Sequence, residues 1–230
     1  MSDMDISPSR IRKAMVSRLS RFRATDLHRQ TAAGPMLSLS FDDVPRTAVT
    51  TGAKILSRYG VPATWFVSGG LESTGPDGEF FMRDDLRALF QDGHELGCHG
   101  FSHIDHQESS LAEIRNDLDQ NAAFFDAVGL PPARAFAYPF GRARPEAKAT
   151  CGKRFEICRG VRPSFGRGVM DFNLLPSFPL YSRSLGIEET HKLIDDLANN
   201  GGLLSFFSHG VTDDPTVYDC TPGHLEDTLA

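Results

Sequence analysis

Short hydrophobic runs alternate along the chain with longer segments in which apolar residues recur at helical spacing. The runs predicted to be strands cover residues 37–43, 63–69, 94–100, 135–141, 155–161, 174–180 and 203–210. The helices predicted among them cover residues 47–58, 83–91, 109–126 and 187–199. Strands that alternate with helices pair in parallel, and this many sequential units most simply close into an α/β barrel.

Polar residues that can carry chemistry gather where the predicted strands end. Asp42 and Asp43 end the first run, His99 and His103 end or follow the third, and His209 ends the last. Barrels and open α/β sheets place their functional sites at the C-terminal ends of their strands. We therefore expect these side chains to lie at one end of the barrel.

The two ends of the chain carry helical patterns. Residues 1–30 form a basic segment in which Ile11, Met15, Leu19 and Phe22 make one apolar stripe flanked by arginines, after a helix start at Ser7. This segment is either a peripheral helix packed on the body, residues 31–230, or a basic amphipathic helix that lies on an anionic membrane through residues 7–23. Near the C-terminus, a short helix is predicted to begin with Thr221 as its cap.

Composition fits one sizeable folded unit, and the charge is unevenly distributed. The chain has 230 residues, 40% of them hydrophobic and 23% charged, with a formal net charge of -6. Residues 1–30 hold seven Lys/Arg against three Asp/Glu, and the remainder holds 17 against 27. An acidic body is unsuited to general nucleic-acid binding, so no nucleic-acid partner is expected.

The cysteines and the N-terminal composition favour a cytoplasmic protein. Four cysteines occur without a CxxC pair, which predicts reduced thiols. The first 23 residues contain no continuous apolar run of the kind that a signal peptide needs, and no later segment approaches a membrane-spanning length. We predict a cytoplasmic location, with the inner membrane surface as an alternative.

Two pairs of residues suggest a metal site. Adjacent carboxylates such as Asp42 and Asp43 are costly at a strand end unless a positive charge neutralises them, although such a pair is also common in solvated turns. His99 and His103 are four residues apart and would share a face if the backbone turns helically, although histidine pairs also occur as core or surface residues. Two imidazoles and one carboxylate leave coordination positions open, as in catalytic metal sites.

Further residues near the strand ends complete a possible hydrolase site. Pro139 and Gly141 form a turn whose backbone N–H groups could face an oxyanion. His209 follows a hydrophobic run, where burial would lower its pKa and a carboxylate would raise it. His94 should face the opposite end of its strand, and His106 is either close to the site or solvated. Metal, base, oxyanion donor and acid are thus all represented.

The ordered motifs "SFDD", "HGFSH", "FAYPFG" and "FFSHG" resemble those of the polysaccharide deacetylase family, the NodB-homology domain of carbohydrate esterase family 4. The resemblance covers about residues 37–229 and implies a distorted, incomplete barrel of about seven parallel strands. By position the resemblance implies that Asp42 is the general base and that His209 is the acid that protonates the leaving amine. It implies that a divalent metal is bound by Asp43, His99 and His103; the metal is usually Zn²⁺, with Co²⁺, Ni²⁺ or Mn²⁺ as alternatives. It also implies that the Phe140 N–H donates to the oxyanion.

The sequence also departs from the family pattern. The motif that commonly begins with an arginine paired to the base has Ala137 there instead, and Arg142, Arg159 or Arg162 could supply the missing cation. The motif that orients the final histidine has no clear counterpart, and Asp171 is a candidate for it. These departures affect the neighbours of the base and the acid, and they leave Asp42 and His209 in place.

The resemblance implies a metal-dependent N-deacetylase that releases acetate from an N-acetylated sugar, such as a polysaccharide, an oligosaccharide or a precursor of lipopolysaccharide or O-antigen. Two alternatives stay open at this point. One is an allantoinase-like hydrolase of a non-sugar amide, and the other is a catalytically silent carbohydrate-binding barrel. The sequence does not indicate an oligomeric state.

Overall fold

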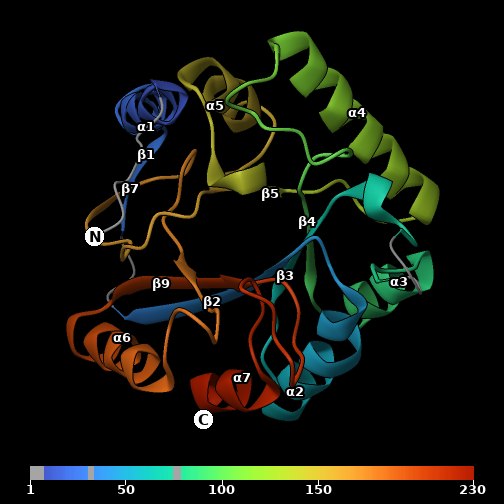
Figure 1. The fold of residues 1–230 in the computed structure, drawn as a ribbon, viewed down its shortest axis with the longest axis vertical. Helices are drawn as coiled ribbons and strands as arrows, with labels where there is room; N and C mark the ends of the chain where they lie inside the picture. Colours follow the sequence, from blue (N-terminus) through green and yellow to red (C-terminus); the bar gives the residue numbers. More distant parts are fainter. Residues whose placement is uncertain (1–7, 31–33, 75–78) are drawn as a thin grey trace.

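A seven-stranded parallel sheet forms the centre of the molecule (Figure 1). The computed structural model describes residues 8–30, 34–74 and 79–230. The sheet has the order β6-β5-β4-β3-β2-β9-β8, so β6 and β8 are its two edges. Its strands are β2 (Pro35–Asp42), β3 (Thr64–Val67), β4 (Glu95–Cys98), β5 (Ala135–Ala137), β6 (Ile157–Arg159), β8 (Phe178–Pro179) and β9 (Gly202–Ser208). The predicted incomplete barrel of about seven parallel strands is confirmed.

Helices surround the sheet, and the ring they form is visible in Figure 1. They are α2 (Ala53–Tyr59), α3 (Arg83–Gln91), α4 (Leu111–Val128), α5 (Pro145–Gly152), α6 (Ile187–Asn200) and α7 (Pro222–Leu229), with a π-helical turn, η1 (Ala48–Gly52), before α2. All the helices predicted between strands are present. The N-cap predicted for the C-terminal helix is also present, because the Thr221 hydroxyl accepts a hydrogen bond from the His224 N–H.

The N-terminal segment is attached to the side of the barrel. It contains α1 (Pro8–Ser20) and β1 (Leu27–Arg29), and β1 pairs antiparallel with β7 (Val169–Asp171). The sequence pattern missed α5, a helix of only eight residues. It also missed the β1–β7 pair, because three-residue strands carry too few positions to show a period. The predicted Ser7 helix start and the Ile11 side chain lie outside the described residues. In the described part of the chain, no helix has the length and apolar character needed to cross a bilayer.

Two hydrophobic cores fix the positions of the strands and of two histidines. The larger core contains Trp65, against whose edge His94 packs, and the His94 Nδ1 accepts the Ala63 N–H at 3.0 Å. In the second core His106 stacks on Phe136 with ring centroids 5.2 Å apart. His106 is fully buried, so the alternative that it is solvated is wrong, whereas its position close to the site stays a prediction. The four cysteines are free and buried.

Candidate active site

The strand ends converge on one cavity of about 550 Å³. Asp42 and Asp43 reach it from the end of β2, and His99 and His103 reach it from the loop after β4. His209 reaches it from the end of β9. The three segments are far apart in sequence, and the parallel sheet brings their C-terminal ends together as the hydrophobic pattern predicted.

Asp43, His99 and His103 form a group that fits a metal ion. The Asp43 Oδ1 lies 3.9 Å from the His99 Nε2 and 3.7 Å from the His103 Nε2, and all three ligand atoms lie within 4.8 Å of one another. Two bonds of 2.0–2.1 Å at a tetrahedral angle separate donor atoms by roughly 3.3 Å, so a small contraction would complete the site. The Asp43 Oδ1 is buried without a hydrogen-bond partner, which a cation at this position would supply.

The environment of His99 prepares it to be a ligand. Its Nδ1 lies 2.8 Å from the carbonyl oxygen of Ala137. A carbonyl only accepts, so the Nδ1 carries the proton and the Nε2 presents its lone pair towards Asp43. Burial, the largest influence, lowers the pKa of His99 to about 3 and keeps the ring neutral.

The loop that carries His103 is not helical, contrary to the geometry assumed for the His99 and His103 pair. Gly100 has φ +77° and His103 has φ +52°, so the chain turns through left-handed conformations. Asp117 of α4 holds this turn by accepting the N–H groups of Phe101 at 2.9 Å and Ser102 at 2.8 Å. A Cβ at Gly100 would lie 2.5 Å from the Asp117 Oδ2, which explains the glycine.

Asp42 forms a buried ion pair with Arg159 at the end of β6. The Arg159 Nη2 lies 2.6 Å from both carboxylate oxygens, and both side chains are about 5% exposed. Burial is the largest influence and raises the pKa of Asp42, but Arg159, followed by His99 and His209, outweighs it, so the pKa is lowered overall. Asp42 is therefore ionised at neutral pH.

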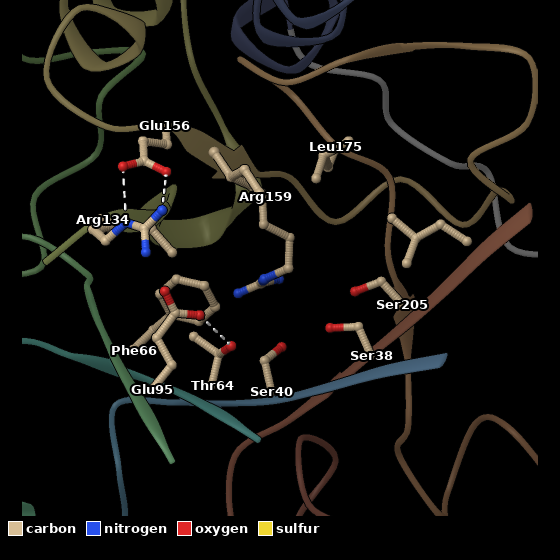
Figure 2. Close-up of a pocket in the computed structure, with 13 residues that line it drawn as sticks. Ser38, Ser40, Thr64, Phe66, Glu95, Arg134, Glu156, Arg159, Leu175 and Ser205 are labelled. Atoms are coloured by element: carbon tan, nitrogen blue, oxygen red, sulfur yellow. Dashed lines mark hydrogen bonds and ion pairs between the residues drawn. The ribbon is translucent and has the colours of Figure 1, made fainter. Parts of the chain in front are cut away.

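Among the three predicted arginines, Arg159 is the one that reaches Asp42. Its side chain enters the barrel interior, where it lines a second cavity of about 300 Å³ together with Ser38, Ser40 and Ser205 (Figure 2). Arg142 lines the active-site cavity but lies 3.4 Å from Asp105, and Arg162 lines a groove beside the N-terminal segment.

Asp43 differs from its neighbour Asp42 in the direction in which its pKa is shifted. Burial is the largest influence and raises its pKa to about 6, with Asp42 adding to the rise and His209 opposing it. Its backbone is also unusual, with φ +60° at Asp43 and +52° at Val44. Left-handed conformations of non-glycine residues cost free energy and occur often at functional sites.

The Nδ1 of His209 lies beside a tyrosine rather than a carboxylate. The Tyr181 hydroxyl lies 3.4 Å from the His209 Nδ1, and the His209 Nε2 lies 3.9 Å from the Asp43 Oδ2. Asp171, the predicted orienting residue, lies on β7 and pairs with Lys148 instead. Asp219, which the sequence analysis missed, holds the backbone after His209 by accepting the Gly210 N–H at 2.7 Å.

Aromatic side chains line the cavity. Phe140, at φ +57° in the turn after β5, is half exposed and presents its ring edge-on to His103 with centroids 4.6 Å apart. Pro139 is buried beneath this turn. Tyr181 and the exposed Tyr218 line the cavity as well. No sequence pattern indicates these two tyrosines, because neither belongs to a strand-end motif.

A family model described as polysaccharide deacetylase matches residues 29–153. Two curated relatives are a bifunctional xylanase/deacetylase of Pseudobutyrivibrio xylanivorans, 27% identical over 105 residues, and a chitooligosaccharide deacetylase of Bradyrhizobium sp. (strain ANU 289), 28% identical over 117 residues. The matches cover 46% and 50% of this chain, and 16% and 50% of the two relatives. This chain therefore spans half or less of the length of these relatives.

Among solved structures, the fold is similar to that of a family 4 carbohydrate esterase from Streptomyces lividans, with a TM-score of 0.56. That match covers 86% of this chain and 88% of the esterase at 15% identity. Identity this low shows a shared fold and carries no statement about the substrate.

Proposed function

Since the chain belongs to the polysaccharide deacetylase family, we propose that it is a metal-dependent N-deacetylase of N-acetylated sugars. The reaction would hydrolyse the acetamide and release acetate. The observation that carries the proposal is the unpartnered, buried Asp43 Oδ1, which faces the Nε2 atoms of His99 and His103 beside the ionised Asp42.

In this proposal Asp43, His99 and His103 hold the metal. One carboxylate oxygen and two imidazole nitrogens suit Zn²⁺ best among available ions, and Co²⁺, Ni²⁺ and Mn²⁺ are also compatible with these donors. A divalent ion held there would supply Lewis acidity, which polarises an amide carbonyl and lowers the pKa of water.

Asp42 is the residue we assign as general base. Its carboxylate lines the cavity and is ionised at neutral pH, so it can accept a proton from a water molecule next to the substrate. Arg159 holds the carboxylate through both oxygens and so limits its rotation. Arg159 thus takes the role of the arginine that Ala137 replaces, from a different strand.

His209 and Phe140 complete the assignment. The His209 Nε2 faces the Asp43 Oδ2, whereas the two histidine ligands face the Oδ1 of the same carboxylate. His209 would donate a proton to the departing amine. Tyr181, whose hydroxyl lies near the His209 Nδ1, would set the orientation of that ring. The Phe140 N–H would donate to the oxyanion, with its backbone already held in a left-handed turn.

The cavity supports an N-acetylated sugar as the substrate class. Its volume of about 550 Å³ accommodates a sugar unit, and aromatic side chains can pack on the apolar face of a sugar ring. Phe140, Tyr181 and Tyr218 supply such surfaces. The four free cysteines support our prediction of a cytoplasmic location, where a precursor of lipopolysaccharide or O-antigen would be accessible.

The two alternatives account for fewer of these features. An amide hydrolase without a metal would not explain the unpartnered Asp43 Oδ1 between two neutral histidine nitrogens. A carbohydrate-binding barrel without catalysis would not need the ionised Asp42 beside His209.

Acetate release tests this proposal. The metal-loaded protein is incubated with N-acetylglucosamine oligomers and, separately, with nucleotide-linked N-acetyl sugars, beside Asp42→Asn. We expect acetate from at least one substrate and almost none from the variant, with metal retained in both proteins. Metal binding without acetate release from any substrate would instead favour the silent carbohydrate-binding barrel.

A further inference from the structure

Helix α1 presents its apolar residues to solvent. Met15 is 65% exposed, Leu19 45% and Phe22, just after the helix, 82%. Met15 and Leu19 lie four residues apart on one face of the helix and Phe22 follows its end, so these three members of the predicted stripe face solvent. The helix therefore contacts the body through residues other than this stripe.

Polar contacts hold α1 in this orientation. The Ser20 hydroxyl donates to the Ala143 carbonyl, and the fully buried Lys148 donates from its Nζ to the carbonyls of Ser20 at 2.8 Å and Arg23 at 3.1 Å. Nearer the start of the helix, the Gln107 side chain donates to the Lys13 carbonyl at 2.7 Å. Rolling the helix to bury its apolar stripe would break these buried hydrogen bonds.

The exposed apolar surface continues from α1 onto the β1–β7 pair. Leu27 of β1 and Val169 of β7 are both more than half exposed, and they line a groove of about 420 Å³ together with Phe22. Figure 1 shows α1, β1 and β7 on the same side of the molecule. We call Met15, Leu19, Phe22, Leu27 and Val169 the N-terminal apolar patch. A contiguous apolar patch of this kind marks an interaction site more often than scattered exposed residues do.

Positive charge surrounds the N-terminal apolar patch. Arg18 and Arg21 flank the stripe, and Arg162 lines the groove together with Arg21. All three side chains are exposed. Apart from residues 1–30 the chain has ten more acidic than basic residues, so this basic surface contrasts with an acidic body.

We propose that the N-terminal apolar patch is a docking surface for an anionic lipid membrane. Headgroups of anionic lipids would pair with the arginines while the apolar side chains enter the boundary of the acyl chains. A symmetric dimer through the same surface is disfavoured, because it would place the arginines of one copy against those of the other. Docking of this kind does not depend on the proposed catalytic function.

Docking would also bring the candidate active site close to the membrane. Val161 lines the active-site cavity, and the next residue, Arg162, lines the groove of the patch. The two surfaces are therefore neighbours, and a sugar attached to a lipid in the membrane would lie near the cavity.

Vesicle sedimentation of the full chain tests the proposal. Vesicles of phosphatidylcholine with phosphatidylglycerol should bind the protein, and pure phosphatidylcholine vesicles should bind it much less. Arg18→Ala and Arg21→Ala should each weaken the binding roughly fivefold, and higher salt should weaken it further. Phe22→Glu should weaken it by about tenfold or more, because a charge replaces a membrane-inserted ring.

Phe90→Glu is the control, because Phe90 is an exposed phenylalanine of α3, 45% exposed, that lies outside the patch. It should bind vesicles like the wild type, and thermal unfolding should show all four variants folded. Equal binding to neutral vesicles, or unchanged binding by Phe22→Glu, would overturn the proposal. So would a concentration-dependent dimer that Phe22→Glu dissociates, since the patch would then be an interface between copies. Because the assay needs neither metal nor turnover, its failure leaves the deacetylase proposal untouched.

Discussion

Two buried ion pairs in this molecule have different surroundings. Lys148 pairs with Asp171 beneath the N-terminal segment, and its other donors bind the carbonyls of Ser20 and Arg23. Arg159 pairs with Asp42 at the strand ends, but its Nε has no hydrogen-bond partner. Next to Asp42, the buried Asp43 Oδ1 also lacks a partner and borders the 550 Å³ cavity.

Incomplete hydrogen bonding at a cavity distinguishes the functional polar cluster around Asp42 and Asp43 from the structural one around Lys148. Lys148 has all its donors satisfied and joins two parts of the fold, as a structural network should. An unpartnered atom alone is insufficient, because Trp65 Nε1 and His106 Nε2 also lack partners, yet neither residue lines the active-site cavity or the cavity beside Arg159. The Asp43 site combines both features, which is why we assign the ligand there.

Asp42→Asn should have the largest effect, and this effect should be limited to catalysis. Loss of a positioned general base typically lowers kcat by about 10²- to 10⁴-fold. The amide can still accept from Arg159, so the metal content should remain that of the wild type. Steady-state acetate release and metal analysis check this together, and a wild-type kcat would show that Asp42 is not the base.

Lys148→Met should have the opposite signature. Removing one partner of a buried ion pair lowers the free energy of unfolding by about 3–5 kcal/mol. Because Lys148 lies outside the cavity, kcat per folded molecule should stay close to the wild-type value. Arg134→Met is the control, since its pair with Glu156 is exposed and contributes little to stability. Denaturant unfolding measures both, and equal losses would remove the distinction.

His106 should affect stability as a function of pH. Burial lowers its pKa to about 4 in the folded protein, whereas the unfolded chain has a pKa of about 6.5. Below pH 6.5 the unfolded state takes up the proton and the folded state does not, so stability falls with falling pH, by about 2 kcal/mol at pH 5.

The variant His106→Phe should lose this contribution to the pH dependence, while His191→Phe, at an exposed histidine, should retain it. Urea unfolding at neutral pH and at about pH 5 compares the two. An unchanged pH dependence in His106→Phe would mean that the buried ring is not neutral in the folded state.

Tyr181→Phe should have the smallest effect. Its hydroxyl makes one long contact with His209, so losing it should lower kcat by about twofold to tenfold. Tyr59→Phe, remote from the cavity, serves as the control, and an equal effect in both variants would exclude an orienting role for Tyr181.

The strands, the main helices and the convergence of Asp42, Asp43, His99, His103 and His209 could be predicted from the sequence. Each follows from local periodicity or from the position of a motif at a strand end. The partner of Asp42 could not be chosen, because Arg159 is 117 residues away and its selection depends on how β6 is placed in the sheet. The outward orientation of α1 was equally hidden, because a helical stripe does not reveal which side the body covers.

The proximity of His99 and His103 was expected from a helical turn that the structure does not contain. A spacing of four residues predicted a helical turn, whereas Gly100 and the Asp117 carboxylate create a left-handed loop that also brings His99 and His103 together. Only the tertiary contact with α4 determines that loop, and a single sequence gives no sign of such a contact.

The metal content of the purified protein tests the central claim most directly. Mass spectrometry would be applied to the wild type, to His103→Ala and to the control His191→Ala after dialysis with zinc. We expect about one bound divalent ion per chain in the wild type and the control, and none in His103→Ala. A wild type that binds no metal, or a His103→Ala protein that retains it, would contradict the site assigned to Asp43, His99 and His103.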